Sequence, residues 1–308
     1  MFVIRHAKRF ALITLAIFVV SLGIVLSLGL KMSIDFTGGA LTEVSYVTVP
    51  EKAAVTEKLD SLNLSGYSLR ESVDEAGRDG YIIRTKDLSE AERIALSREV
   101  SALGEGGEIT RFTTIGPVIG EELRSKAVWA IGAVALVIVL YVAFAFRGLT
   151  KPVSSWGYGG ITILSLIHDV LVPTAMMSLL GYFLGAEIDT LFVMAILAVL
   201  GYSVNDTIVV FDRVRENLLE AEEKKGREPF SDIVGRSITQ TFLRSFNTSF
   251  TTLLALSALY FFGGEVTENF ALVLIAGVVA GTYSSLFMAP PLLVLYADRI
   301  DRKKSVNS

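Results

Sequence analysis

The sequence predicts a polytopic α-helical membrane protein with six transmembrane helices and a small α+β, ferredoxin-like extracytoplasmic domain between helices 1 and 2. Composition is the first reason: 52% of the 308 residues are hydrophobic and only 19% are charged, which is far from the average of soluble domains. A helix needs about 20 apolar residues to cross the membrane. Six stretches are long enough, near 10–30, 127–146, 156–183, 190–211, 246–262 and 270–294.

The first span follows Arg5, Lys8 and Arg9, as a signal peptide would. Its uncharged run from Phe10 to Leu30 is longer than the usual apolar region of a signal peptide, so we expect this span to be retained. Cationic residues gather at the N-terminus, between spans two and three, between spans four and five, and after span six, whereas the other short loops have none. The positive-inside rule then predicts a cytoplasmic location for both termini and an extracytoplasmic one for residues 31–126.

Residues 31–126 alternate between strand and helix signals. Ser89 and Glu92 form a capping-box pattern at the start of the second helix. The strands are predicted near 41–49, 67–73, 81–85 and 109–115, with helices after Pro50 and after Ser89. The order βαββαβ is typical of a split, ferredoxin-like sandwich. The segment has no histidine or cysteine, which favours binding or mechanical work over catalysis.

The chain is expected to divide into four parts. These are the N-terminus with the first span (1–30), the outer domain (31–126), a five-helix transmembrane bundle (127–297) and a cytoplasmic tail (298–308). Within the bundle, residues 212–245 carry two apolar stripes at helical spacing, which predict amphipathic cytoplasmic helices lying against the inner membrane surface or a partner. A soluble connector is the alternative.

Two aspartates fall inside predicted spans. Asp206 lies in the fourth span, Asp169 follows His168 in the third, and Arg244 opens the fifth. An ionised aspartate at mid-bilayer costs about 2.5 to 3.5 kcal/mol even on lenient scales, so such a residue is a functional candidate. Counting about 1.5 Å per residue places Asp206 about 22 Å from the outer surface and Asp169 about 10 Å nearer the midplane.

We interpret Asp206 as a proton carrier, because a buried carboxyl has a raised pKa unless a cation restores its charge, and Arg244 could provide that cation. The alternatives are a fixed structural ion pair with Arg244 and a carboxylate reached by water. For Asp169 the order is reversed: a satisfied pair with His168 or a hydroxyl is favoured over a relay role.

Spans five and six also carry polar or small residues. The hydroxyl and amide groups between Asn247 and Thr252 predict either a hydrated crevice or helix packing, and sequence does not separate the two. In span six, Gly277 and Gly281 form a GxxxG pair beside Ser284 and Ser285, which predicts close helix approach.

Composition also excludes functions. A net charge of −4 gives no basic surplus for nucleic acid, and the absence of cysteine excludes disulfides, thiolate metal sites and cysteine nucleophiles. No cofactor or metal is expected, with protons as the coupling ion.

Four motifs carry a family resemblance. They are Asp35-Phe36-Thr37-Gly38-Gly39, the segment 115–120, the segment 201–217 with Gly201 and Asn205, and Gly281-Thr282-Tyr283-Ser284-Ser285. With them the chain resembles the SecF branch of the SecD/SecF family, which is related to resistance-nodulation-division (RND) transporters. SecD members share related motifs but have a much longer outer segment.

This resemblance implies a non-enzymatic subunit of the bacterial inner membrane. Together with SecD it would use the proton motive force to assist late, ATP-independent translocation of unfolded preproteins. The implied partners are SecD, the SecYEG channel, SecA, YajC and membrane lipid, and the implied relay residues are Asp206 and Arg244. The alternatives are an RND-type exporter of lipid or small molecules, an intramembrane aspartyl protease and a passive scaffold.

Overall fold

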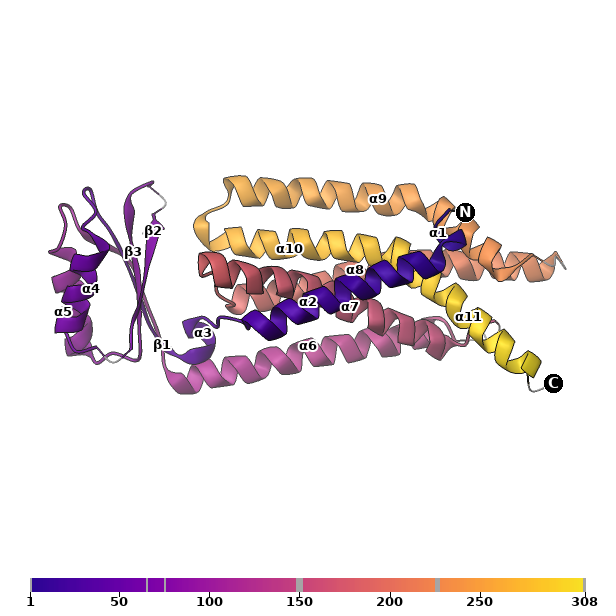
Figure 1. The fold of residues 1–308 in the computed structure, drawn as a ribbon, viewed down its shortest axis with the longest axis horizontal. Helices are drawn as coiled ribbons and strands as arrows, with labels where there is room; N and C mark the ends of the chain where they lie inside the picture. The colour runs from indigo at the N-terminus through magenta and orange to yellow at the C-terminus, as the bar shows by residue number, and fades with distance from the viewer. Residues whose placement is uncertain (1, 65, 75, 148–151, 225–227, 307–308) are drawn as a thin grey trace.

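The computed structural model describes every residue except 1, 65, 75, 148–151, 225–227 and 307–308. Some of the cationic residues used above to predict the orientation are among these exceptions. A small α/β domain lies at one end of a long helical bundle (Figure 1). The bundle contains α1 (Phe2–Arg5), α2 (Ala7–Leu28), α3 (Ile34–Thr37), α6 (Pro117–Ala145), α7 (Ser155–Leu184), α8 (Thr190–Glu223), α9 (Phe230–Phe262), α10 (Glu265–Tyr283), the π-helical turn η1 (Ser284–Met288) and α11 (Ala289–Val306).

The outer domain follows the predicted element order. It contains β1 (Gly39–Ser45), α4 (Lys52–Ser61), β2 (Ser68–Val73), β3 (Asp79–Thr85), α5 (Glu90–Ser101) and β4 (Glu108–Ile115). The strands form an antiparallel sheet in the order β2-β3-β1-β4. Both helices cover the sheet face that points away from the bundle (Figure 1), and Val55, Leu59, Leu96 and Val100 pack against it. The capping box of Ser89 at the start of α5 is confirmed.

In the part of the chain that is described, five helices are long and apolar enough to cross a membrane: α2, α6, α7, α8 and the continuous stretch Thr267–Ile300. The predicted span 246–262 is not among these five; it forms the second half of α9, which runs beside α10 (Figure 1). Polar residues between Asn247 and Thr252 lower the hydropathy of this segment. Its mainly apolar part extends only from Leu253 to Phe262.

Residues 212–245 extend the two spans that flank them. α8 continues to Glu223 and α9 begins at Phe230. The apolar stripes pack into one core with α7 and α11, and Val214, Val234 and Ile238 are fully buried there. These stripes therefore face each other and the bundle, which corrects the expectation that they cover the inner membrane surface or a partner. Helical spacing identifies a buried face without telling what covers it.

The outer domain contacts the bundle at residues 185–189, the loop between α7 and α8. Arg70 on β2 donates a 2.5 Å hydrogen bond to the carbonyl of Gly185, and Arg84 on β3 pairs with Glu187. The loop also forms a short parallel bridge with the chain just before α3, through Ile188. The domain is thus attached directly to the outer end of α8.

Candidate functional site

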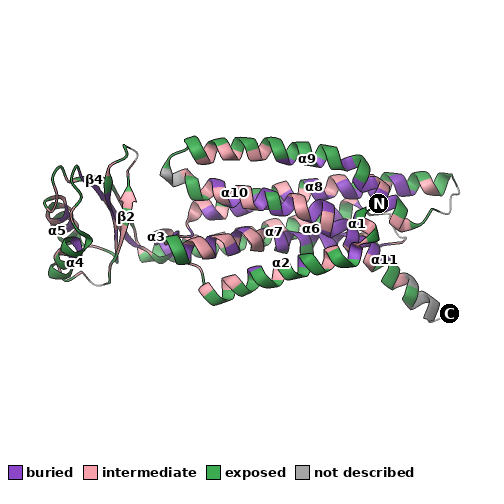
Figure 2. Cartoon of the chain, turned by 45° about the horizontal axis from the view of Figure 1, so that its top comes forward, coloured by how far each residue is buried: buried purple, intermediate pink, exposed green. Residues whose placement is uncertain are grey.

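Among the described residues of the bundle, the buried histidine and the buried carboxylates lie on α7 and α8. Buried residues concentrate along α7 and α8, whereas α2 and α9 are largely exposed (Figure 2). Asp169 and Asp206 lie on the buried faces of these two helices. In such surroundings an ionisable side chain needs a specific partner.

Asp169 on α7 is 0% exposed and has three hydrogen-bonding partners. His168 contacts one carboxylate oxygen through Nδ1 at 2.9 Å. The other oxygen accepts hydrogen bonds from Ser284 at 2.7 Å and from Ser203 on α8. The structure agrees with the interpretation of Asp169 as a satisfied polar group held by His168 and hydroxyls.

Asp206 on α8 has a sparser environment. It is 7% exposed, and Ser285 donates a 2.5 Å hydrogen bond to Oδ2. Arg244 lines the same cavity of about 180 Å³, together with Tyr202, Asn205, Val209 and Thr248. As far as the chain is described, no ion pair joins Arg244 to Asp206, so the alternative of a fixed structural pair is wrong for this conformation.

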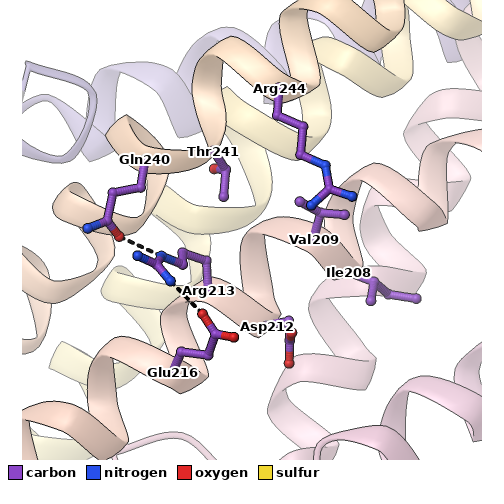
Figure 3. Close-up of a pocket in the computed structure, with 8 residues that line it drawn as sticks. All are labelled: Ile208, Val209, Asp212, Arg213, Glu216, Gln240, Thr241 and Arg244. Atoms are coloured by element: carbon purple, nitrogen blue, oxygen red, sulfur yellow. Dashed lines mark hydrogen bonds and ion pairs between the residues drawn. The ribbon is translucent and has the colours of Figure 1, made fainter.

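A second, larger cavity of about 440 Å³ shares Val209 and Arg244 with the first. It lies between α8 and α9, where Arg213 is held by Glu216 at 2.6 Å and by Gln240 at 2.7 Å (Figure 3). Arg244 extends toward Val209 at the boundary between the two cavities (Figure 3). Polar space therefore reaches from the α8–α9 hairpin to the carboxylate of Asp206.

The two aspartates lie at similar depth, which corrects the expected offset of about 10 Å in height. Asp169 is 15 residues before the outer end of α7 at Leu184, and Asp206 is 16 residues after the outer end of α8 at Thr190. At about 1.5 Å per residue these positions are about 22 and 24 Å from the outer ends. The estimate failed because it counted Asp169 from the inner end, and α7 is longer than a minimal span.

Sequence reasoning did not identify Ser203 and Ser285 as ligands of the acids. Ser284 and Ser285 are consecutive, yet each contacts a different carboxylate. They lie at the start of the π-helical turn, a rare geometry that is frequent at functional sites. Only their place in a small-residue segment signalled them.

Gly277 and Gly281 lie where α10 crosses α8. A Cβ at Gly277 would collide with the side chain of Val199, and one at Gly281 would crowd Ser203. Close helix packing, as predicted, brings Ser284 and Ser285 to the acids. A Cβ at Gly201 would meet no atom within 4 Å, and this residue, like Asn205, is exposed.

The motif from Asp35 to Gly39 lies at the junction with the outer domain. Asp35 accepts hydrogen bonds from the backbone and hydroxyl of Thr190, at 3.0 and 2.8 Å, and so caps α8. Phe36 is buried in the bundle, and Thr37 bonds back to Ser33. Burial raises the pKa of the adjacent Asp189, and the Asp35 carboxylate adds to this shift.

Gly38 and Gly39 have φ angles of 71° and 122°. A side chain at Gly38 would also meet the backbone of Pro117, and one at Gly39 would meet that of Thr85. Glycine is required here because the domain, α3 and the start of α6 meet too closely for a Cβ.

The polar face of α9 is only partly used inside the chain. Ser249 accepts hydrogen bonds from Tyr202 at 3.1 Å and from Thr282 at 2.6 Å. Asn247, Thr248 and Thr251 are exposed. The face therefore packs through one residue and presents the others outward.

Comparison with known proteins gives consistent matches. The family model described as "Protein export membrane protein SecD/SecF, C-terminal" matches residues 96–299. A protein translocase subunit SecF from Thermobaculum terrenum is 38% identical over 96% of this chain and 94% of its own length. Another, from Sebaldella termitidis, is 37% identical over 87% of this chain and 82% of its own.

Solved structures agree with these matches. A crystal structure of SecDF, a translocon-associated membrane protein from Thermus thermophilus, superposes with a TM-score of 0.81 at 34% identity, covering 96% of this chain. A SecDF structure in a super-membrane-facing form gives a TM-score of 0.69. The chain spans only 38% of the first of these proteins and 39% of the second.

Proposed function

Because this chain belongs to the SecD/SecF family of protein-export membrane proteins, we propose that it is a translocase subunit of the SecF type. In this proposal it uses the proton motive force to assist late, ATP-independent movement of unfolded preproteins across the membrane. It has a transport role and is not an enzyme. Protons act as the coupling ion.

The observation that carries this proposal is the environment of Asp206. The carboxylate is buried, has one hydroxyl partner, and shares a cavity with an arginine that does not pair with it. An arginine that approaches a carboxyl favours release of its proton, and Arg244 lines the cavity of Asp206. A membrane potential supplies about 2.3 kcal/mol per charge per 100 mV, enough to bias a conformational equilibrium. Protonation of Asp206 can thus be linked to movement of α8 against α9.

SecD is the proposed main partner. The matching Thermus thermophilus protein is called SecDF, and this chain covers 37% of it. The exposed polar groups Asn205, Asn247, Thr248 and Thr251 support such a partner, because polar side chains at membrane depth need protein or water beside them. The family resemblance extends the prediction to SecYEG, SecA, YajC and the translocating chain.

The finer architecture also belongs to this proposal. We propose that the second half of α9 is the sixth span, since it runs beside α10, and that both termini are in the cytoplasm at the inner membrane of a bacterium. The strand order β2-β3-β1-β4 with two helices on one face supports a ferredoxin-like outer domain.

The rival functions fit less well. An aspartyl protease needs two carboxylates in direct contact, whereas Asp169 and Asp206 bind separate serines. An exporter of lipid or small molecules would use an apolar pocket in the outer domain, whereas both cavities described above lie between α8 and α9.

The test is export into inverted membrane vesicles with and without a proton gradient. We expect Asp206→Asn to abolish the stimulation by the gradient, because the amide cannot take up a proton. Asp212→Asn is the matched control, since this exposed carboxylate lies on the same helix at the wider cavity. Normal stimulation in Asp206→Asn, with SecD still co-purifying, would reduce the chain to a passive scaffold.

A further inference from the structure

Three consecutive residues at the end of α10 connect three other helices. Tyr283 hydrogen-bonds Thr14 on α2 at 3.1 Å, Ser284 contacts Asp169 on α7, and Ser285 contacts Asp206 on α8. The two serines begin the π-helical turn. A single turn of backbone thus holds both buried acids.

His168 is the unexplained member of this cluster. It is 1% exposed, and its Nδ1 contacts Asp169 at 2.9 Å. Its other ring nitrogen, Nε2, is buried and has no hydrogen-bonding partner among the described residues. The ring of Tyr283 lies beside it, with the ring centres 5.9 Å apart. A buried nitrogen without a partner is costly to retain and calls for an explanation.

The chemistry of the pair makes Nε2 the place for a proton. With Nδ1–H donating to Asp169, the neutral imidazole keeps its lone pair on Nε2. Asp169 already contacts two serine hydroxyls and Nδ1 of the histidine. Adding a proton at Nε2 creates an imidazolium beside a carboxylate, so the pair becomes neutral overall.

We propose that His168 and Asp169 form a second proton-binding site beside the serines that contact Asp206, in which Nε2 of His168 takes up the proton. When Asp206 gives up its proton and His168 gains one, Asp206 becomes a carboxylate and the histidine an imidazolium. This inference rests on the proposed proton-driven function and adds a second proton-binding site to it.

The serines can serve both protonation states without moving. Ser285 lies 3.1 Å from the carbonyl of Thr282 as well as 2.5 Å from Asp206. Ser284 lies 3.1 Å from the carbonyl of Gly281 and 2.7 Å from Asp169. A hydroxyl can donate to the charged carboxylate in one state and to the carbonyl in the other. Rotation of each hydroxyl can therefore accommodate a change of charge at the acid it contacts.

The titratable groups around His168 come from four helices. Asp169 is on its own helix, Asp206 faces the cluster from α8, and Tyr283 from α10. Arg244 approaches from α9 across the cavity of Asp206. Protonation of His168 should therefore depend on the charge at Asp206.

The chain contains two histidines, so His6→Gln leaves His168 as the only one. We would label histidine isotopically in this variant, reconstitute the full chain with SecD in lipid, and follow the imidazole nitrogen resonances against pH. We expect a change from the neutral Nδ1–H form to the imidazolium, with a midpoint that shifts in Asp206→Asn. A histidine that stays in one form over the whole range, or a midpoint indifferent to Asp206, would overturn the proposal.

A second variant tests the role in transport. In His168→Asn the amide can still donate to Asp169 but cannot bind a proton, so we expect folding to persist and gradient-driven export to be lost. Ser165→Ala, one turn earlier on α7 and equally buried, is the control and should export normally. Native export in His168→Asn rejects the second site, whereas native export in Asp206→Asn rejects the proposed function, so the two failures are distinguishable.

Discussion

The close contact of α10 with α8 can be tested by adding one methyl group at Gly277. Alanine in place of glycine at an open helical position gains about 1 kcal/mol. At Gly277 the new Cβ would meet Val199, which is 1% exposed, and overpacking of this kind costs about 1–3 kcal/mol. Gly132→Ala on α6 is the matched control, because nothing lies within 4 Å of its Cβ position. The propensity gain applies to both variants, so we expect them to differ by the overpacking cost of about 1–3 kcal/mol in the free energy of unfolding.

The assay is denaturant unfolding of the purified protein in mixed micelles, followed by gradient-driven export. Val199→Ala removes the two methyl groups that the new Cβ would strike, so the double variant with Gly277→Ala should recover about 0.5–3 kcal/mol as coupling energy. Export should fall in Gly277→Ala alone, because separating α10 from α8 draws Ser285 away from Asp206. Equal stabilities for Gly277→Ala and Gly132→Ala would refute the packing argument.

Three further predictions concern the outer domain. Burial raises the pKa of Tyr46 to about 12, and the nearby Tyr81 contributes; its folded pKa exceeds the unfolded value near 10, so stability should fall as pH rises from about 10 to 12. Tyr46→Phe should remove this loss of stability at high pH. It should also cost about 1 kcal/mol at neutral pH, because the 2.9 Å hydrogen bond to a backbone carbonyl is lost; unfolding curves measured against pH would show both effects. Arg84 and Glu187 should couple by about 0.5–3 kcal/mol in a double-mutant cycle with alanine, because their side chains are only 18% and 15% exposed; independent effects would contradict this. Asp35→Ala should speed hydrogen exchange in the first turn of α8, because it removes the oxygen that accepts hydrogen bonds from the amide and hydroxyl of Thr190; unchanged exchange would argue against the cap.

Local patterns in the sequence were enough to predict several elements. The capping box at Ser89 and the order of strands and helices in the outer domain follow from residues near each other in the chain. The buried acids were found because a charge inside an apolar run is rare. In each case a short stretch contained the whole signal.

Other features depend on contacts that no short stretch encodes. A π-helical turn differs from an α-helical one by a single residue per turn, and the stretch from Ser284 to Leu286 gives no local sign of it. The contact of Ser203 with Asp169 joins two helices and requires the crossing at Gly281. The depth of Asp169 was misjudged because apolar length gives the minimum of a span, and α7 exceeds that minimum.

The length of α8 has a mechanical consequence. Its 34 residues form one uninterrupted helix of about 51 Å. Asp35, at the junction with the α/β domain, accepts a hydrogen bond from the first residue of this helix, Thr190. Asp206 lies partway along it, and the helix ends in the hairpin with α9. A rigid helix moves as one body, so a shift of its end near the α/β domain also shifts Asp206 and the hairpin with α9. Under the proposed function, proton uptake at Asp206 and movement of the α/β domain would therefore be coupled through displacement of α8.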